Sequence, residues 1–190
     1  MGYSLAWLAT RGKPIESLLA ELHLRRTGTV GEYTDEPIVG APLEGGWYLL
    51  VARGCDHRMI TDSVLKTISR GCRMIACSVE EHMTWSLTME WDNGREIWSV
   101  YHQGDEEVHN LTTSGALPDF FASIRDEIMA EQAAVGGADA GVDCVFEAPL
   151  ELARRITGFR HSSDENVVEP FEILLEAMPA KPPRPWWQFW

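Results

Sequence analysis

Residues 84–102 constrain the fold more than any other part of the sequence, because apolar and polar side chains alternate on both sides of one tight turn. The apolar residues before the turn are Trp85, Leu87, Met89 and Trp91. The turn itself contains Asn93 and Gly94, a pair that readily adopts the positive φ angles of a two-residue hairpin. The pattern therefore predicts two antiparallel strands with one apolar face.

The register of this hairpin follows from the turn if the strands pair regularly. With Asn93 and Gly94 at the centre, the expected cross-strand pairs are Met89 with Trp98, Leu87 with Val100, and Trp85 with His102. The predicted second face carries Thr88, Glu90 and Ser99.

The other segments indicate a mixture of strands and helices. Apolar runs at residues 3–9, 47–52 and 73–79 are too short for typical helices and suit strands. Helical spacing of apolar residues follows Pro14, Asp62, Pro118 and Pro149, and a last short helix is expected after Pro170. Glycine and proline between residues 34 and 46 predict a loop.

These elements predict an α+β fold with a mainly antiparallel sheet of about six to seven strands and helices packed on one face. We expect residues 1–178 to form a single domain and residues 179–190 to form a tail rich in proline and tryptophan.

The charge of the chain is unevenly distributed. The sequence has a formal net charge of -13, and residues 76–151 hold 16 acidic and 2 basic side chains, a balance of -14. Acidic side chains repel phosphate backbones and anionic lipid, so we expect neither a nucleic-acid partner nor binding to an anionic membrane surface. Solvated strand and helix faces explain such a block, and so does a surface that attracts a basic partner.

The candidate partner-binding residues lie at predicted strand ends and in the tail. The acidic ones are Glu80, Glu81, Asp105, Glu106 and Glu107. The aromatic ones are Trp186, Trp187 and Trp190, because tryptophan is frequent at binding hot spots. These tryptophans either fold back on their own chain, adsorb to a membrane interface, or contact a partner such as a second subunit in a homodimer.

A catalytic or metal site is a weaker interpretation of the same region. Glu81 and His82, with His57, have the side chains of a general acid and base, although no second catalytic constellation accompanies them. A zinc site from Cys55, His57, Cys77 and His82 has unspecific spacing, so no metal or cofactor is expected. The nucleotide-binding, zinc-protease and hydrolase motifs are absent from the sequence.

The sequence contains no apolar run of the roughly 18 residues that a membrane-spanning helix needs. Residues 1–13 lack the order of a secretory signal, and the four cysteines match no disulfide or zinc pattern, so we expect reduced thiols and a cytoplasmic location. The strings at 55–57 and 77–82 and the hairpin at 91–98 resemble those of bacterial cytoplasmic proteins, which implies no activity.

Together these features favour a non-enzymatic acidic protein that binds a basic protein partner, in the manner of an immunity protein or inhibitor. The alternative is an enzyme or small-ligand-binding protein with a cleft around His57, Glu80, Glu81 and His82.

Overall fold

The computed structural model describes residues 2–104, 109–162 and 166–177 of the 190-residue chain. Nine antiparallel strands form one sheet in the order β2-β9-β3-β4-β1-β5-β6-β7-β8. The strands are β1 Ser4–Arg11, β2 Leu24–Val30, β3 Ile38–Leu43, β4 Trp47–Arg53, β5 Arg73–Glu80, β6 Trp85–Asp92, β7 Arg95–Gln103, β8 Leu111–Gly115 and β9 Glu172–Glu176.

Four α-helices accompany the sheet in the described residues, so the α+β prediction is confirmed. They are α1 Ile15–Glu21, α2 Asp62–Ile68, α3 Phe121–Ala134 and α4 Glu147–Thr157. Short 3-10 turns lie at η1 Glu44–Gly46, η2 Arg58–Ile60, η3 Glu81–Met83 and η4 Gly137–Asp139. None of the helices in this part of the chain is both long and apolar enough to cross a membrane.

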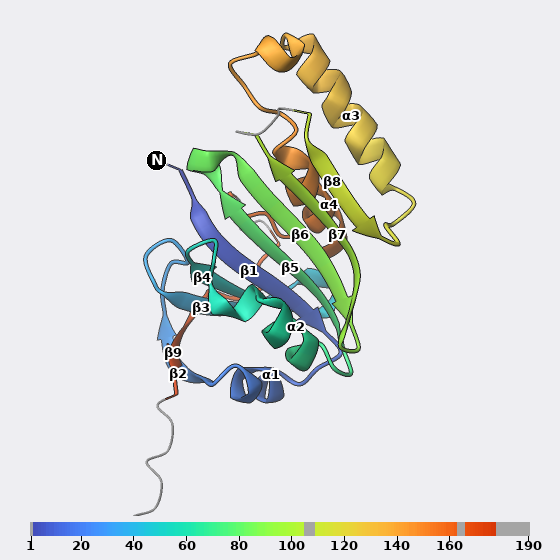
Figure 1. Ribbon diagram of the computed structural model, residues 1–190. Helices are drawn as coiled ribbons and strands as arrows, with labels where there is room; N and C mark the ends of the chain where they lie inside the picture. The colour runs from blue at the N-terminus through green and yellow to red at the C-terminus, as the bar shows by residue number, and fades with distance from the viewer. Residues whose placement is uncertain (1, 105–108, 163–165, 178–190) are drawn as a thin grey trace, which may run out of the picture.

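The prediction that helices cover only one face of the sheet is wrong. Helices α1 and α2 pack with Leu8, Met74 and Trp91 on one face, while α3 and α4 pack with Trp7 and Trp98 on the other. Figure 1 shows α2 in front of the sheet and α4 behind it. The side chains on both faces of β1 are buried, so helices must pack against both faces of the sheet.

The predicted strand number of six to seven is too low, partly because residues 34–46 contain β3 rather than only a loop. Pro42 lies inside β3 although it has no N–H to donate. On one side β3 pairs along its whole length with β4, but on the other side β9 pairs only with Val39 and Gly40. Pro42 therefore stands where the ladder with β9 has ended, a position that tolerates proline.

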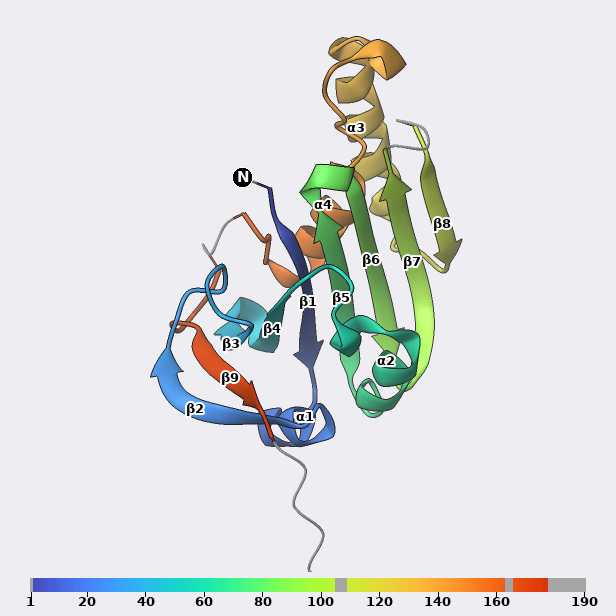
Figure 2. The ribbon, with the colours of Figure 1, turned by 60° about the vertical axis from the view of Figure 1, so that its left-hand side comes forward.

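The helix expected after Pro170 is also wrong, because that segment forms β9. Figure 2 shows β9 between β2 and β3, and it pairs with both. A helix of this length is marginal by itself, whereas a strand in this position bonds to two neighbours. Leu174 is buried there against the α1 and α2 face.

The turn of the β6–β7 hairpin is as predicted, but the register is not. Asn93 and Gly94 have φ angles of 49° and 80°, which suit the predicted two-residue turn. An irregularity between Glu90 and Trp91 shifts the pairing, so that Met89, Leu87 and Trp85 pair with the residues that follow the predicted partners. The observed pairs are Met89 with Ser99, Leu87 with Tyr101, and Trp85 with Gln103.

This β-bulge decides which side chains share a face. Trp98 lies opposite Glu90 instead of Met89, and its indole Nε1–H donates to Glu90 Oε2 at 2.8 Å. Arg73 on β5 donates two hydrogen bonds to the same carboxylate, at 2.8 and 3.0 Å. The polar positions of β6 thus form a buried face with the apolar positions of β7, which binary alternation alone does not reveal.

Candidate functional site

The antiparallel register brings four strand ends together at one end of the sheet. Ser4 at the start of β1 pairs with Glu80 at the end of β5. Glu80 pairs with Trp85 at the start of β6, and Trp85 pairs with Gln103 at the end of β7. Glu80 therefore lies two strands from Gln103, whereas Asp105, Glu106 and Glu107 lie outside the described residues, so their convergence with Glu80 stays a prediction.

A hollow of about 280 Å³ opens at this end of the sheet, and we call it the β5–β7 pocket. Its lining residues are Cys55, Asp56, Glu80, Met83, Trp85 and Gln103. Met83 is 54% exposed, unusually high for a large apolar residue, and Trp85 contacts Tyr101 edge to face at 5.9 Å. The surface that faces the pocket is almost entirely apolar, and two of its lining residues, Asp56 and Glu80, carry carboxylates.

The Glu80 carboxylate is the polar group of this pocket with the best-defined surroundings. Its Oε1 accepts hydrogen bonds from the His82 backbone N–H at 3.2 Å and contacts His82 Nδ1 at 3.1 Å. A hydrogen bond from Ser4 has the largest effect on the pKa of Glu80 and lowers it. Desolvation raises this pKa, but the contacts with His82 lower it further, so it lies below its ordinary value. Glu80 is therefore negatively charged at neutral pH.

Glu81 points to a different partner from Glu80. Its Oε1 lies 3.0 Å from Nε2 of His161, and its Oε2 accepts the Tyr3 backbone N–H at 2.8 Å. The His161 ring is buried and packs edge to face on Tyr3. The two carboxylate oxygens of Glu81 thus connect the end of β5 to Tyr3 near the N-terminus and to the segment after α4, so this carboxylate stabilises the fold.

Two residues of the catalytic and metal alternatives, His57 and Cys77, have separate surroundings. His57 accepts the Met59 N–H through Nδ1, and burial lowers its pKa. Cys77 is fully buried in the core facing α3 and α4, where burial raises its thiol pKa to about 12. Among the described residues, no three histidine, cysteine or acidic side chains are placed to hold a metal ion.

Ion pairs neutralise much of the acidic block from residue 76 to residue 151. Glu90 binds Arg73, Glu147 binds Arg160, and Glu151 binds both Arg154 and Arg155. Each of these arginines lies outside the block. The exposed acidic residues of the block that have no ion pair within the described chain are Asp92, Glu96, Asp119, Glu131 and Asp139. The surface is therefore less negative than the sequence count indicates.

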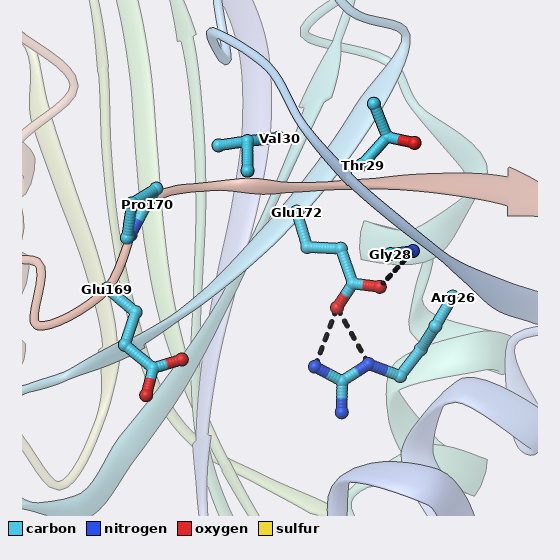
Figure 3. A pocket seen from close by; sticks show the side chains of 7 residues that line it. All are labelled: Arg26, Gly28, Thr29, Val30, Glu169, Pro170 and Glu172. Carbon is cyan, nitrogen blue, oxygen red and sulfur yellow. Dashed lines mark hydrogen bonds and ion pairs between the residues drawn. The ribbon is translucent and has the colours of Figure 1, made fainter.

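A larger hollow of about 530 Å³ lies between β2 and the start of β9 (Figure 3). Its main charged groups already bind each other, because Arg26 donates to Glu172 at 2.7 Å and Gly28 N–H donates to the other carboxylate oxygen at 2.8 Å. A ligand there would have to compete with this ion pair, so we regard the β5–β7 pocket as the better candidate site.

Several predicted partner-binding residues lie outside the described residues: Asp105, Glu106, Glu107, Trp186, Trp187 and Trp190. Sequence reasoning missed Met83, Trp85 and Gln103 as pocket residues. Met83 could have been recognised from the sequence, because an apolar residue in a short turn between two strands is rarely buried in the core. His161, the buried partner of Glu81, is 80 residues away in the sequence, and no pattern in the sequence indicated this contact.

No protein-family model matches this sequence, and neither the curated proteins nor the solved structures contain a significant match.

Proposed function

We propose that the protein is a non-enzymatic binding module for a basic protein partner, and that the β5–β7 pocket receives a lysine or arginine side chain of that partner. The observation that carries this proposal is the composition of the pocket. Met83 and Trp85 belong to the apolar surface that makes up nearly all of its lining, and the lining residues Asp56 and Glu80 carry carboxylates.

This combination suits the two basic side chains. Lysine and arginine bury an apolar stem and keep a charged head, so one side chain can use both parts of the pocket. A tryptophan face also attracts a cation directly. The Glu80 carboxylate is ionised at neutral pH, where lysine and arginine are charged, and its lowered pKa keeps it ionised in more acidic solution than an ordinary glutamate.

The size of the pocket agrees with a side chain as occupant. Small-molecule sites commonly enclose roughly 300–1,000 Å³. The volume of about 280 Å³ is just below that range, and the net charge of -13 steers a basic protein toward the molecule. Inhibition of a basic toxin would be one concrete form of this function.

A test begins with affinity capture, identification of the captured protein, and titration of the purified pair by calorimetry. We expect a basic partner whose binding weakens as NaCl rises from about 50 to about 300 mM. Glu80→Gln should weaken binding about tenfold or more, since a hydrogen bond to a charged group contributes about 1.5–3 kcal/mol.

The matched control is Glu44→Gln, which neutralises an exposed carboxylate in η1, at the opposite end of the sheet from the β5–β7 pocket. Its affinity should stay within about twofold of the unmodified protein, because surface charges far from a contact are screened. A partner that is not basic, or equal binding by Glu80→Gln, would contradict the proposal.

The alternative of a small-ligand site or enzyme has one contact in its favour, the 3.1 Å approach of His82 Nδ1 to Glu80. A thermal-shift screen against metal ions and metabolites tests it, because a ligand at 100 times its dissociation constant stabilises the fold by about 2.7 kcal/mol. A shift that His82→Asn removes would favour the alternative.

A further inference from the structure

The two edges of the sheet differ in how they resist pairing with another strand. At one edge, β2 carries the exposed Arg25 and Arg26, and its pairing with β9 is irregular between Arg26 and Val30. Charged side chains and irregular pairing are common ways in which proteins protect a sheet edge. The β2 edge is therefore protected.

The opposite edge, β8, has neither protection. Its sequence Leu-Thr-Thr-Ser-Gly contains no charge and no proline, and Thr112, Thr113 and Ser114 are all exposed. Figure 1 shows β8 at the outer side of the sheet beyond β7. An uncharged, exposed edge strand is a template for a further strand.

The backbone of β8 presents free hydrogen-bonding groups along this edge. Ala116 N–H donates to Ile97 C=O on β7 at 3.0 Å, next to the pair of Trp98 with Gly115. Because the bonds of an antiparallel ladder alternate, Ser114 and Thr112 bond to β7, and Thr113 directs its N–H and C=O away from β7. Within the described chain, no other group bonds to them.

The edge is also held in place before any partner binds. His102 on β7 is fully buried, and its Nδ1 contacts Asn110 C=O at 2.7 Å, just before β8. Its Nε2 contacts Asp143 Oδ2 at 2.8 Å, which fixes the ring against the segment before α4. A strand that is already ordered loses little conformational entropy on binding.

We infer that β8 is a docking strand, onto which an extended segment of the basic partner adds as a tenth strand. The inference rests on the proposed function for the charge of the partner. Helix α3 begins six residues after β8 ends. It exposes Asp126, which binds Arg125, Glu127, which binds Arg155, and Glu131, which has no ion pair within the described chain. A second copy would bring another charge of -13 to this edge, which disfavours self-pairing.

The test uses an acetylated and amidated octapeptide of alternating lysine and valine, with a glutamate–valine peptide as the charge control. We expect the lysine peptide to shift the ¹H–¹⁵N signals of residues 111–115. It should also slow hydrogen exchange at the Thr113 amide at least about tenfold, because that N–H gains an acceptor.

The variant Thr113→Pro removes the outward N–H, a change that an edge strand tolerates, and Thr113→Val keeps it. We expect Thr113→Pro to weaken peptide binding at least tenfold and Thr113→Val to change it less than twofold, with native ¹H–¹⁵N spectra for both variants. The exchange measurement on the unmodified protein decides the matter if Thr113→Pro does not fold.

Three results would overturn this inference or the function beneath it, and they are distinguishable. Salt-sensitive peptide binding without protection of Thr113, or with equal affinity in Thr113→Pro, would refute the docking strand and leave the proposed function standing. Equal binding of the glutamate peptide would refute the basic partner. A dimer of the unmodified protein that becomes monomeric in Thr113→Pro, seen by sedimentation, would make a second copy the occupant.

Discussion

The contact between Trp98 and Glu90 exists only because of the β-bulge in the β6–β7 hairpin, so its energy tests the register. The experiment compares Trp98→Phe, Glu90→Met and the double variant. Trp98 is 1% exposed and Glu90 is 8% exposed, and their hydrogen bond is 2.8 Å long. For a bond to a charged acceptor we expect a coupling energy of about 1.5–3 kcal/mol.

The single variants should differ in a way that follows from the burial of each partner. Glu90→Met leaves the buried indole N–H without an acceptor, which costs about 1–3 kcal/mol. It also removes the partner of Arg73, but that side chain is 35% exposed and water can replace the carboxylate, so this loss adds at most about 1 kcal/mol. We therefore expect Glu90→Met to lower the free energy of unfolding by about 2–4 kcal/mol.

Urea denaturation followed by far-ultraviolet circular dichroism measures all four proteins without depending on tryptophan fluorescence. In a regular ladder without the bulge, Trp98 and Glu90 lie on opposite faces of the sheet and do not touch. The two changes would then be additive within about 0.5 kcal/mol. Such additivity would refute the register described here.

Three further predictions concern other parts of the molecule. In the native protein, Cys55 should react with a thiol reagent at pH 8 much faster than Cys77, whose thiol is buried with a pKa of about 12; equal rates would contradict this burial. The hydrogen bond from Arg26 holds the pKa of Glu172 below its ordinary 4.5, so its contribution to stability is present above that pH and disappears as the pH falls through the lowered pKa. Thermal unfolding across this range should show a shallower acid decline for Glu172→Gln, and an unchanged decline would argue against the ion pair. Gly40→Ala should cost about 1–3 kcal/mol in urea denaturation, because an added Cβ would lie 2.6 Å from the Tyr48 hydroxyl; a neutral effect would contradict this close packing.

Local patterns predicted the elements that local forces determine. The Asn93-Gly94 turn follows from the φ preferences of two adjacent residues. The apolar stripe of α3, with Ile124 and Ile128 buried, follows from helical periodicity. None of these features depends on distant parts of the chain.

The failures arise where distant segments compete with local preference. Residues 172–176 have helical apolar spacing, but the gap between β2 and β3 offers two hydrogen-bonded neighbours, and neither neighbour is near in sequence. The alternation of apolar and polar residues does not reveal the extra residue in β7. The polar face of β6 is buried by its contacts with Arg73 and α4, so polarity does not show which face of the hairpin packs inward.

The candidate site shows the same division. The sequence indicated Glu80 through its place in an acidic group at a strand end, and the structure places this carboxylate in the β5–β7 pocket. Glu81, its neighbour, binds His161 instead. The sequence alone did not show that Glu80 and Glu81 have different surroundings. Adjacent residues at the end of a strand point in different directions, and the segments that contact them are distant in the sequence.

Binding of a basic side chain in the β5–β7 pocket can be followed in ¹H–¹⁵N spectra recorded during titration with the lysine–valine peptide. We expect saturable shifts of the Trp85 indole and the Glu80 amide, which weaken with added salt and are strongly reduced in Glu80→Gln. Peptide binding that leaves both of these signals unmoved, or that moves them equally in Glu80→Gln, would contradict this expectation.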